Sequence, residues 1–325
     1  MSGQHDDRLR YYRDQSAWRD LQQFLPERLR LGDDSVPEEE FWDWNGHKIH
    51  LDRYRNPAAA AKVVLHHGVG TNGRQMTLIL GSPLARLGFE TVAVDDLGFG
   101  LTRVVPGSRY SYDDWVRMVV DFLAYEKTRD DRPIVLYGLS AGGMLTYHAA
   151  AAAPTGTLAG IVGMTFLDQR VQQVRDETAH DLITARLGPP VMGLVAGTPL
   201  GGMRYSMALA SKMSALANDN DAMKVFMQDR TSAGNAMPIR FLHSYMTFTP
   251  AVEPADFDAC PVLLTQPAED RWSPRHLSTP VLSKISKVPV REVSLVNAGH
   301  YPLEDPGLQQ MVDSIAEFTR EVTAA

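Results

Sequence analysis

Short runs rich in valine, isoleucine and leucine alternate with helical stretches along most of the 325-residue chain. Runs of this kind are typical of strands buried on both faces, which occur in mostly parallel sheets covered by helices on each side. The pattern predicts an α/β fold with one mostly parallel central sheet. The predicted strands are KVVLHHG, ETVAVDD, PIVLYG, LAGIVGMTF, PVLLTQ and REVSLVN, and the clearest predicted helices are YDDWVRMVVDFLAYEKTR, GGMLTYHAAAAA and GLQQMVDSIAEFTREV.

The alternation stops after Leu167 and resumes after Pro254. The intervening segment reads as irregular helices broken by GPP, GTPLGG and AGNAMP. A single sheet interrupted by a helical insertion explains this order more economically than two domains in tandem. The predicted organisation is an N-terminal helical arm at 1–40, a first core part at 41–167, a helical cap at 168–254 and a second core part at 255–325.

The arm carries apolar residues among nearly balanced charges, which predicts an amphipathic helix that docks on the body or on another subunit. Packing on its own domain is the favoured reading, although the arm and the cap are both candidate surfaces for a homodimer. After the arm, FWDWNG and KIHLDRYR predict a hairpin that turns at Asn45–Gly46. The apolar residues of the arm are Leu9, Trp18, Leu21, Phe24 and Leu25.

Composition excludes several classes of function. The formal net charge is −7 and the pI is about 5.8, so there is no basic stripe for nucleic acid. No uninterrupted apolar stretch reaches ~18 residues, which predicts no membrane span. The N-terminal MSGQHDDRLRYYRDQ has acidic residues where a signal peptide needs an apolar core, so we expect a cytoplasmic protein. The single cysteine, Cys260, rules out an internal disulfide and is expected to be a small buried residue rather than a nucleophile.

The segment IVLYGLSAGGML places Ser140 between Gly138 and Gly142, after a predicted strand and before a predicted helix. It fits the pattern G-x-S-x-G, in which a serine occupies a strained turn with its hydroxyl clear of the sheet. Glycines flank such a serine because side chains there would collide with the neighbouring strand and helix. The alternative is a pair of turn glycines beside a serine that only caps a helix.

A nucleophilic serine needs a base, usually histidine, and an acid that orients the base. His300 follows the last predicted strand, and Asp270 follows the strand before it. Catalytic groups gather at the carboxyl ends of such strands, and the chain order Ser, Asp, His is the expected one. Asp168, which follows GIVGMTFL, is the alternative acid; we favour Asp270 because its strand immediately precedes the histidine strand. The alternative for His300 is a solvated loop histidine.

The segment VVLHHGVGTNG supplies a glycine-rich loop whose Val69 N–H can donate to an oxyanion, with the Ala141 N–H as the second donor. His66 and His67 are consecutive, so they point to opposite faces of a strand. No cysteine or acidic cluster follows at ligand spacing, and no metal site is predicted. The remaining histidines are expected to be solvated or packed: His47, His50, His148, His180, His243 and His276.

Five segments together resemble the α/β-hydrolase family, in its capped branch of serine esterases, monoacylglycerol lipases and serine aminopeptidases. They are VVLHHGVG, AVDDLGFGLT, GLSAGG, PAEDRWSP and NAGHYPLEDP, in family order from about Phe41 to the C-terminus. The resemblance implies an α/β-hydrolase fold, with helices on both faces of the central sheet and a helical cap inserted after the sixth strand. It also implies that Asp95, Gly98 and Gly100 form a turn that shapes the floor of the site without reacting.

The chain departs from many relatives at Leu139, where they have histidine, and at Ala141, where methionine is frequent. The acid loop begins QPAED where relatives often show HGxxD. These departures leave Ser140, Asp270 and His300 in place. They do not allow an assignment to one subfamily.

These features predict a serine hydrolase that cleaves a carboxylester, lactone or thioester of an apolar small molecule, of the carboxylesterase or lipase type. Ser140 is the expected nucleophile, His300 the base and Asp270 the orienting acid, with oxyanion donors at Val69 and Ala141. No cofactor and no metal are expected. One alternative is a carbon–carbon bond hydrolase or cofactor-free perhydrolase with the same triad. Another is a non-catalytic ligand-binding receptor on a hydrolase scaffold.

Methionine is concentrated in the predicted cap, which holds eight of the fourteen in the chain. These flexible side chains predict either an irregular apolar pocket or the small core of the cap itself. If several face the pocket, activity should rise with acyl-chain length. The residues are Met192, Met203, Met207, Met213, Met223, Met227, Met237 and Met246.

Overall fold

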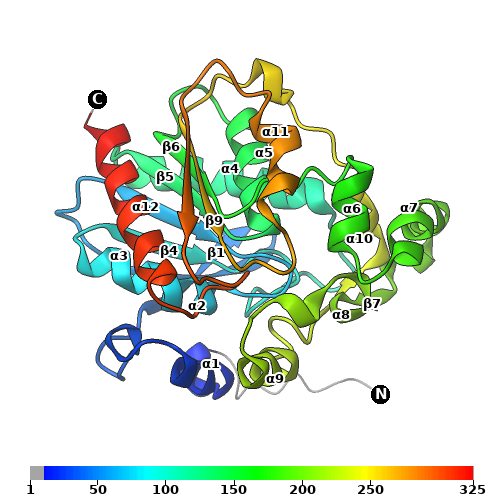
Figure 1. The fold of residues 1–325 in the computed structure, drawn as a ribbon, viewed down its shortest axis with the longest axis horizontal. Coiled ribbons are helices and arrows are strands. Elements are labelled where there is room, and N and C mark those ends of the chain that lie inside the picture. The colour runs from blue at the N-terminus through cyan, green and yellow to red at the C-terminus, as the bar shows by residue number, and fades with distance from the viewer. Residues whose placement is uncertain (1–10, 325) are drawn as a thin grey trace.

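The computed structural model describes residues 11–324 and contains one eight-stranded sheet (Figure 1). Its strand order is β1-β2-β4-β3-β5-β6-β9-β10, and only the β1–β2 and β2–β4 pairs are antiparallel. The predicted mostly parallel sheet is confirmed. The strands are β1 (Glu38–Trp44), β2 (His47–Tyr54), β3 (Lys62–His66), β4 (Glu90–Val94), β5 (Ile134–Gly138), β6 (Gly160–Gly163), β9 (Val262–Pro267) and β10 (Val290–Leu295).

The β1–β2 hairpin turns where the sequence predicts it. Trp44 pairs with His47, which leaves Asn45 and Gly46 as a two-residue turn. Their φ angles are 48° and 82°, so both lie in the left-handed region that such hairpin turns require. Asparagine and glycine adopt this region at the lowest cost, which explains the sequence at the turn.

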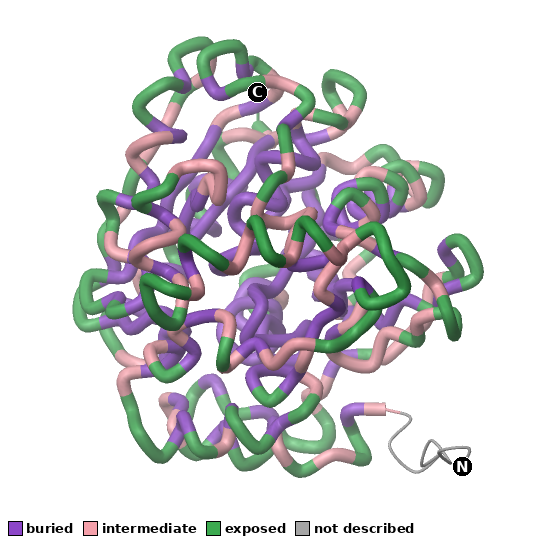
Figure 2. The backbone as a smooth tube through the Cα atoms, turned by 90° about the vertical axis from the view of Figure 1, so that its right-hand side faces the viewer, coloured by how far each residue is buried: buried purple, intermediate pink, exposed green. Residues whose placement is uncertain are grey.

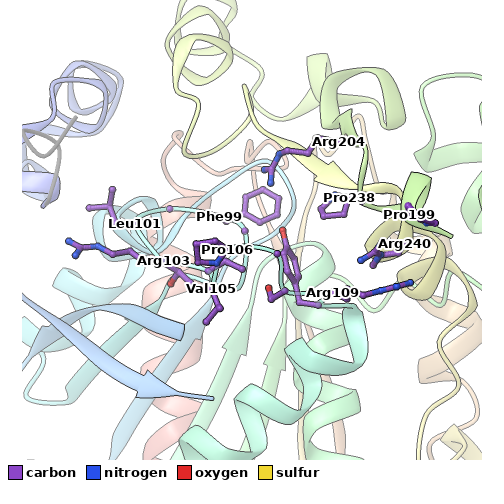
Figure 3. A pocket seen from close by; sticks show the side chains of 18 residues that line it. Phe99, Leu101, Arg103, Val105, Pro106, Arg109, Pro199, Arg204, Pro238 and Arg240 are labelled. Atoms are coloured by element: carbon purple, nitrogen blue, oxygen red, sulfur yellow. The ribbon is translucent and has the colours of Figure 1, made fainter. Parts of the chain in front are cut away.

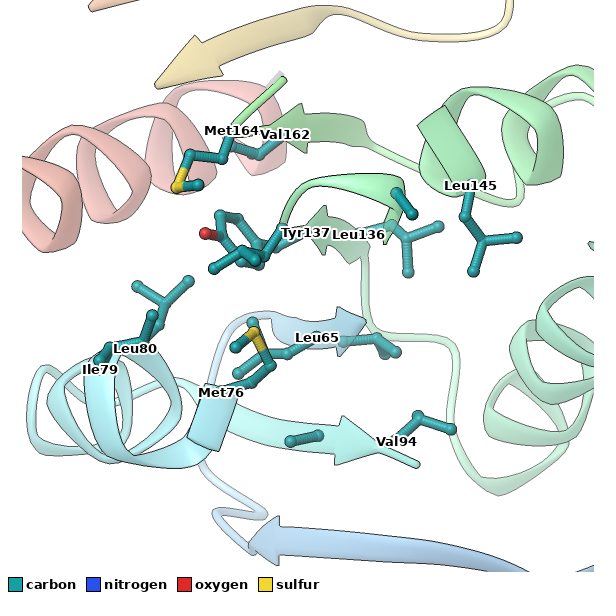
Figure 4. Packing of buried hydrophobic residues seen from close by; sticks show 14 of the residues in the cluster. Leu65, Met76, Ile79, Leu80, Val94, Leu136, Tyr137, Leu145, Val162 and Met164 are labelled. Atoms are coloured by element: carbon teal, nitrogen blue, oxygen red, sulfur yellow. The ribbon is translucent and has the colours of Figure 1, made fainter. Parts of the chain in front are cut away.

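Helices cover both faces of the sheet (Figure 4). On β5, Leu136 points toward Leu145 of α5, whereas Tyr137 points to the opposite face. There the Tyr137 hydroxyl lies 3.6 Å from the sulfur of Met311 in α12. The flanking helices are α2 (Gly73–Met76) and α3 (Ser82–Arg86), joined by a π-helical turn at Thr77–Gly81, together with α4 (Tyr112–Arg129), α5 (Ala141–Ala152), α11 (Thr279–Leu282) and α12 (Gly307–Thr323). In Figure 2 the buried segments run through the middle of the molecule and the exposed segments lie outside them.

A helical cap is inserted between β6 and β9, which confirms its predicted place after the sixth strand. The cap also contains a two-stranded antiparallel sheet that the sequence analysis did not predict. Strand β6 ends at Gly163, so Asp168 lies in the following loop rather than at the end of the strand. The cap elements are α6 (Gln172–Thr178), α7 (Leu182–Ala196), β7 (Arg204–Ser206), α8 (Met207–Ala210), α9 (Asn220–Gln228), β8 (Ala236–Pro238) and α10 (Ile239–Thr247). The domain boundaries given above stay a prediction.

The described part of the arm packs on its own chain. It contains one short helix, α1 (Ala17–Leu21), and several 3₁₀ turns instead of one long amphipathic helix. Helix α1 lies against α9 of the cap (Figure 1). Trp18, Leu21 and Leu25 are buried and Phe24 is half-buried, whereas Leu9 lies outside the described residues. The homodimer stays a prediction.

A buried hydrogen bond ties the arm to the core. The Tyr12 hydroxyl donates to the Asp95 carboxylate, at 2.9 Å from Oδ2, although 83 positions separate the two residues. Both side chains are almost fully buried. Because a buried carboxylate needs hydrogen-bond donors, Tyr12 is an integral part of the core structure around Asp95.

Two further predictions concern single features of the chain. In residues 11–324, no helix has the length and apolar character needed to cross a membrane. Cys260 is 4% exposed, and burial raises the pKa of its thiol to about 12. A thiol with this pKa stays protonated and is a poor nucleophile at neutral pH, in agreement with the predicted packing role.

Candidate active site

Ser140 occupies a strained turn between β5 and α5. Its φ and ψ angles are 55° and −120°, in a region that side chains other than glycine rarely adopt. A Cβ atom on Gly138 would collide with the Gly142 carbonyl, and a Cβ on Gly142 would lie 2.6 Å from the His67 carbonyl oxygen. The turn therefore requires glycine at both positions, for the steric reason that the G-x-S-x-G pattern predicts.

The structure brings His300 and Asp270 together. Both side chains are buried, and His300 Nδ1 lies 2.9 Å from Asp270 Oδ2. The two residues follow β10 and β9, which are parallel neighbours with Leu295 opposite Pro267. The loop after β9 is also tied to the loop after β10, because the Glu269 amide donates to the Ala298 carbonyl at 2.9 Å.

The Asp270 carboxylate is held by its own loop. The amides of Trp272 and Ser273 each donate to Oδ1 at 2.8 Å, and the Ser273 hydroxyl donates to Oδ2 at 2.9 Å. Burial alone would raise the pKa of Asp270, but His300 and these donors outweigh burial and hold the pKa below its ordinary value. Asp270 is therefore an anion at neutral pH and can orient a histidine.

Sequence reasoning missed Ser273. Its Oγ atom lies 2.9 Å from His300 Nδ1 as well as 2.9 Å from Asp270 Oδ2, so it contacts both members of the pair. Because Oγ donates to the carboxylate, it can accept from the protonated Nδ1. The only sequence signal was a serine three residues after an aspartate, a spacing typical of an aspartate-stabilised turn.

Asp168, the alternative acid, has another partner. Its Oδ2 lies 2.8 Å from Arg170 Nη2, and Arg170 also forms an ion pair with Glu253 at 2.6 Å. The structure thus pairs Asp168 with an arginine, whereas it pairs Asp270 with His300.

The structure joins His300 to Asp270, but the second ring nitrogen of His300 is not hydrogen-bonded to Ser140. Nε2 is buried and hydrogen-bonds with no other residue of the described chain. The Trp272 ring, centred 4.8 Å from the His300 ring, lines the same cavity as Ser140. With Nδ1 engaged by Asp270, Nε2 is the nitrogen that can accept a proton.

The loop after β3 approaches the serine closely. A Cβ atom on Gly68 would lie 2.7 Å from Cβ of Ser140, and the next residue, Val69, lines the Ser140 cavity. Ala141 lines it too and is the first residue of α5, where a helix amide has no intrahelical partner. The loop is held by a hydrogen bond of 3.0 Å from the Gly68 amide to the Thr71 hydroxyl. Val69 and Ala141 thus both line the cavity beside Ser140.

The neighbouring histidines are packed and buried. His66 Nδ1 lies 2.9 Å from Asp96 Oδ1, and His67 Nε2 accepts from the Asp96 amide at 3.0 Å. These contacts give both residues structural partners next to the glycine-rich loop.

A cluster of Glu39, His50 and Asp52 has ligand atoms close enough to share an ion. Arg74 already pairs with Asp52, at 2.5 Å from Nε to Oδ2. His50 lies between Glu39 and Asp95, at 3.1 Å and 3.0 Å, and these carboxylates overcome the effect of burial and raise its pKa to about 9. Each carboxylate of this cluster therefore already has a cationic partner, Arg74 for Asp52 and His50 for Glu39.

The cavity beside Ser140 is small and mostly apolar, with a volume of about 80 Å³. Three of the eight cap methionines line it, namely Met192, Met207 and Met246. The cap methionines thus divide between the two predicted roles, except for two that are exposed. Met213, Met223 and Met237 are buried elsewhere, whereas Met203 and Met227 are 57% and 40% exposed. The other apolar lining residues include Leu167, Ala185, Leu242, Tyr245 and Trp272.

The turn after β4 forms as expected, but it does not form the floor of this cavity. Gly98 and Gly100 have φ angles of 87° and 54°, and the Asp95 carboxylate accepts from the Leu101 amide at 2.8 Å. None of Asp95, Gly98 and Gly100 lines the Ser140 cavity. The physical reason is the strand order, because β3 lies between β4 and β5.

Comparisons with known structures agree with this architecture. A soluble variant of monoglyceride lipase from Saccharomyces cerevisiae is 16% identical, with a TM-score of 0.70 over 92% of this chain and 98% of that one. Monoacylglycerol lipase from Paleococcus ferrophilus is also 16% identical, with a TM-score of 0.64 over 85% of this chain and 98% of that one. Est1E from Butyrivibrio proteoclasticus is 16% identical, with a TM-score of 0.56 over 88% of this chain and 99% of that one. At this level of identity the likeness establishes the fold.

Among curated protein sequences, none matches the chain. The sequence profile of the alpha/beta hydrolase family matches residues 63–310, which include Ser140, Asp270, His300 and the whole cap. This match spans more than half of the chain and agrees with the observed strand order and cap. The chain therefore belongs to the alpha/beta hydrolase family.

Proposed function

We propose that the protein is a serine hydrolase that cleaves carboxylic esters of small apolar molecules through a covalent acyl-enzyme. The observation that carries the proposal is the strained Ser140 on the wall of an apolar cavity that Val69, Ala141 and Trp272 also line, with the Trp272 ring against His300 of the buried His300–Asp270 pair. The structural likeness to proteins described as monoglyceride lipase and monoacylglycerol lipase supports ester substrates.

In the first half of the reaction, Ser140 Oγ attacks the ester carbonyl while His300 Nε2 takes the hydroxyl proton. Asp270 accepts from Nδ1, which keeps Nε2 free as the base and stabilises the imidazolium that forms. The Val69 and Ala141 amides donate to the oxyanion of the tetrahedral intermediate. The intermediate then collapses, the carbon–oxygen bond to the alcohol breaks, and His300 gives its proton to the departing alkoxide.

In the second half, a water molecule attacks the acyl-serine carbonyl. His300 takes a proton from this water, and the same two amides stabilise the second oxyanion. Release of the carboxylic acid returns the proton to Ser140. No cofactor enters either half of this scheme, because the nucleophile, base and oxyanion donors are all protein groups.

Carbon–carbon bond hydrolysis and perhydrolysis would use the same residues and differ in the bond attacked or in the second nucleophile. The apolar lining of the cavity favours simple acyl esters for this chain. A ligand-binding receptor would retain the pocket without covalent chemistry.

Labelling with a fluorophosphonate tests the proposal, because this reagent reacts covalently with activated serines. We expect one label per chain, on the peptide that contains Ser140, and loss of labelling and p-nitrophenyl ester hydrolysis in Ser140→Ala. Ser283→Ala is a matched control, since Ser283 is exposed and its hydroxyl donates to the Thr279 carbonyl of its own helix turn. Labelling of another serine in the unmodified protein would refute the assignment, and a folded protein without any labelling would favour the receptor.

A further inference from the structure

A second, larger groove lies between the core and the cap, with a volume of about 1050 Å³ (Figure 3). The core side is residues 98–110, which follow β4. The cap side comes from the loop after α7 and from residues around β7 and β8. The groove shares no lining residue with the Ser140 cavity. It is a separate site that the proposed reaction does not use.

The groove is strongly cationic in a chain whose net charge is −7. Four arginines line it and no aspartate or glutamate does: Arg103, Arg109, Arg204 and Arg240. Within residues 11–324 their partners are the Phe41 ring and neutral oxygen atoms, with no carboxylate. Elsewhere, buried arginines such as Arg53 and Arg74 pair with acids. The charge of the groove is therefore not neutralised by the described protein.

Two of these guanidinium groups lie together at one end of the groove. Arg109 comes from the core and donates to the Gly197 carbonyl at 3.0 Å, and Arg240 comes from the cap and donates to the adjacent Thr198 carbonyl at 3.4 Å. Figure 3 shows the two side chains side by side. Like charges so placed repel each other, and an anion bound between them would remove that cost.

The groove also contains polar donors without acceptors. The Tyr110 side chain lines the groove and is 6% exposed, and its hydroxyl lies beside the Arg204 guanidinium, which can only donate to it, so the hydroxyl proton has no acceptor among the described residues. Ser108 Oγ and Arg240 Nε, which are also buried atoms, likewise have no acceptor among these residues. Buried polar groups are rarely left unpaired in a native protein. Three such atoms in one cationic groove indicate a ligand that supplies acceptor oxygens.

We propose that this groove binds an organic anion, with a phosphate or carboxylate head held by Arg109, Arg240 and Tyr110. Arginine matches both groups because its planar donors can contact two oxygens at once. The walls next to these residues are apolar, at Pro199 and Pro238, so the ligand is expected to carry an apolar body as well as its charged head.

Such a ligand would join the core to the cap. Helix α10 begins at Ile239, lines the groove with Arg240 and reaches the Ser140 cavity with Leu242 and Met246, within two turns of Arg240. An anion shared by Arg109 and Arg240 would fix the start of α10 against the core. The consequence is that ligand binding should raise the melting temperature, because it stabilises only the folded chain.

Calorimetric titration with hexyl phosphate tests the proposal on full-length Ser140→Ala protein, which makes the result independent of the proposed hydrolase activity. We expect saturable binding that is at least tenfold weaker in Arg109→Gln/Arg240→Gln and several-fold weaker in Tyr110→Phe. Arg129→Gln/Arg320→Gln, which removes the same charge from exposed sites on α4 and α12, should bind like the parent. Inorganic phosphate should bind more weakly than hexyl phosphate.

Vesicles of phosphatidylcholine with and without phosphatidic acid identify the source of the anion. If only the vesicles with phosphatidic acid capture the protein, and Arg109→Gln/Arg240→Gln abolishes this capture, the anion is a lipid headgroup. If the protein binds hexyl phosphate but neither kind of vesicle captures it, the anion is a soluble ligand. Circular dichroism checks that each variant is folded. If the double variant does not fold, the affinity of Tyr110→Phe for hexyl phosphate tests the proposal instead. The proposal is refuted if neither probe binds, or if binding is unchanged in the folded Arg109→Gln/Arg240→Gln and Tyr110→Phe proteins.

Discussion

Gly68 and Ser140 meet so closely across the ends of β3 and β5 that a Cβ atom on Gly68 would lie 2.7 Å from Cβ of Ser140. The same methyl group would lie 3.0 Å from the Leu139 carbonyl oxygen. The loop that carries Val69 can thus be placed beside the serine only if residue 68 has no side chain.

Replacing Gly68 with alanine should therefore move the Val69 amide away from the oxyanion. We expect kcat for a p-nitrophenyl ester to fall by about 10²-fold or more, the effect of losing one oxyanion donor. Gly188→Ala is the control, because nothing lies within 4 Å of a Cβ at that position. Unchanged kcat in folded Gly68→Ala would show that Val69 is not a donor.

Asp270→Asn should lower kcat by about 10³- to 10⁴-fold, because an amide cannot hold His300 in the correct tautomer or stabilise its cation. Asp168→Asn should cost far less, since Asp168 pairs with Arg170. Steady-state kinetics of the two variants, with matched circular dichroism, separate the two acids. A larger loss in Asp168→Asn would mean that the acid has been assigned to the wrong loop.

Ser273→Ala should lower kcat about tenfold with little change in KM, because the serine hydroxyl positions both Asp270 and His300 without reaching the substrate. Ser273→Thr keeps the hydroxyl and should recover most of the loss. If Ser273 only stabilised the fold, Ser273→Ala would lower the melting temperature and leave kcat unchanged. Thermal unfolding of the same variants measures the melting temperature.

The cavity volume of about 80 Å³ revises the expectation that activity rises with acyl-chain length. Ligand pockets are usually larger, at roughly 300 to 1,000 Å³, so we expect acetate or butyrate esters to be cleaved faster than dodecanoate. Met246→Ala should enlarge the cavity and shift the optimum toward longer chains. Rates with a series of p-nitrophenyl esters measure the chain-length preference of the unmodified protein and of Met246→Ala. A preference for dodecanoate in the unmodified protein would mean that the cap opens.

The raised pKa of His50, about 9, predicts that stability depends on pH. Below the unfolded pKa of roughly 6.5, both states are protonated and the stabilisation is complete. As the pH rises toward 9, only the folded state keeps the proton, so the free energy of unfolding should fall by up to about 1.4 kcal/mol per pH unit. Urea unfolding between pH 6 and 9.5 measures how the free energy of unfolding changes with pH. His50→Gln should reduce this pH dependence, whereas His180→Gln, at an exposed site, should leave it unchanged.

Local sequence patterns predicted much of the fold and part of the site. The Asn45–Gly46 turn and the glycines around Ser140 were predictable because each depends on the steric needs of a few adjacent residues. The helix at Tyr112–Arg129 was predicted to the residue because its apolar positions recur at helical spacing.

Other features depend on contacts between distant parts of the chain. Ser273 acquires its role only when β9 and β10 bring its loop beside His300. The arginine groove depends on how the cap lies over the turn after β4, which no local pattern encodes. The described part of the arm, residues 11–40, forms only short helical turns, because its apolar side chains pack into the core and against α9 instead of forming one continuous helix face.

The hydrogen bond between Tyr12 and Asp95 has a consequence for synthesis on the ribosome. Tyr12 leaves the ribosome before Asp95, which follows 83 residues later, and α9, against which α1 lies, is made later still. Translation proceeds at roughly 5 to 20 residues per second, so Tyr12 and Trp18 stay without their final partners for several seconds. During that interval the nascent chain exposes aromatic surface that a chaperone can bind, and Tyr12 and Trp18 reach their native contacts long after they are made.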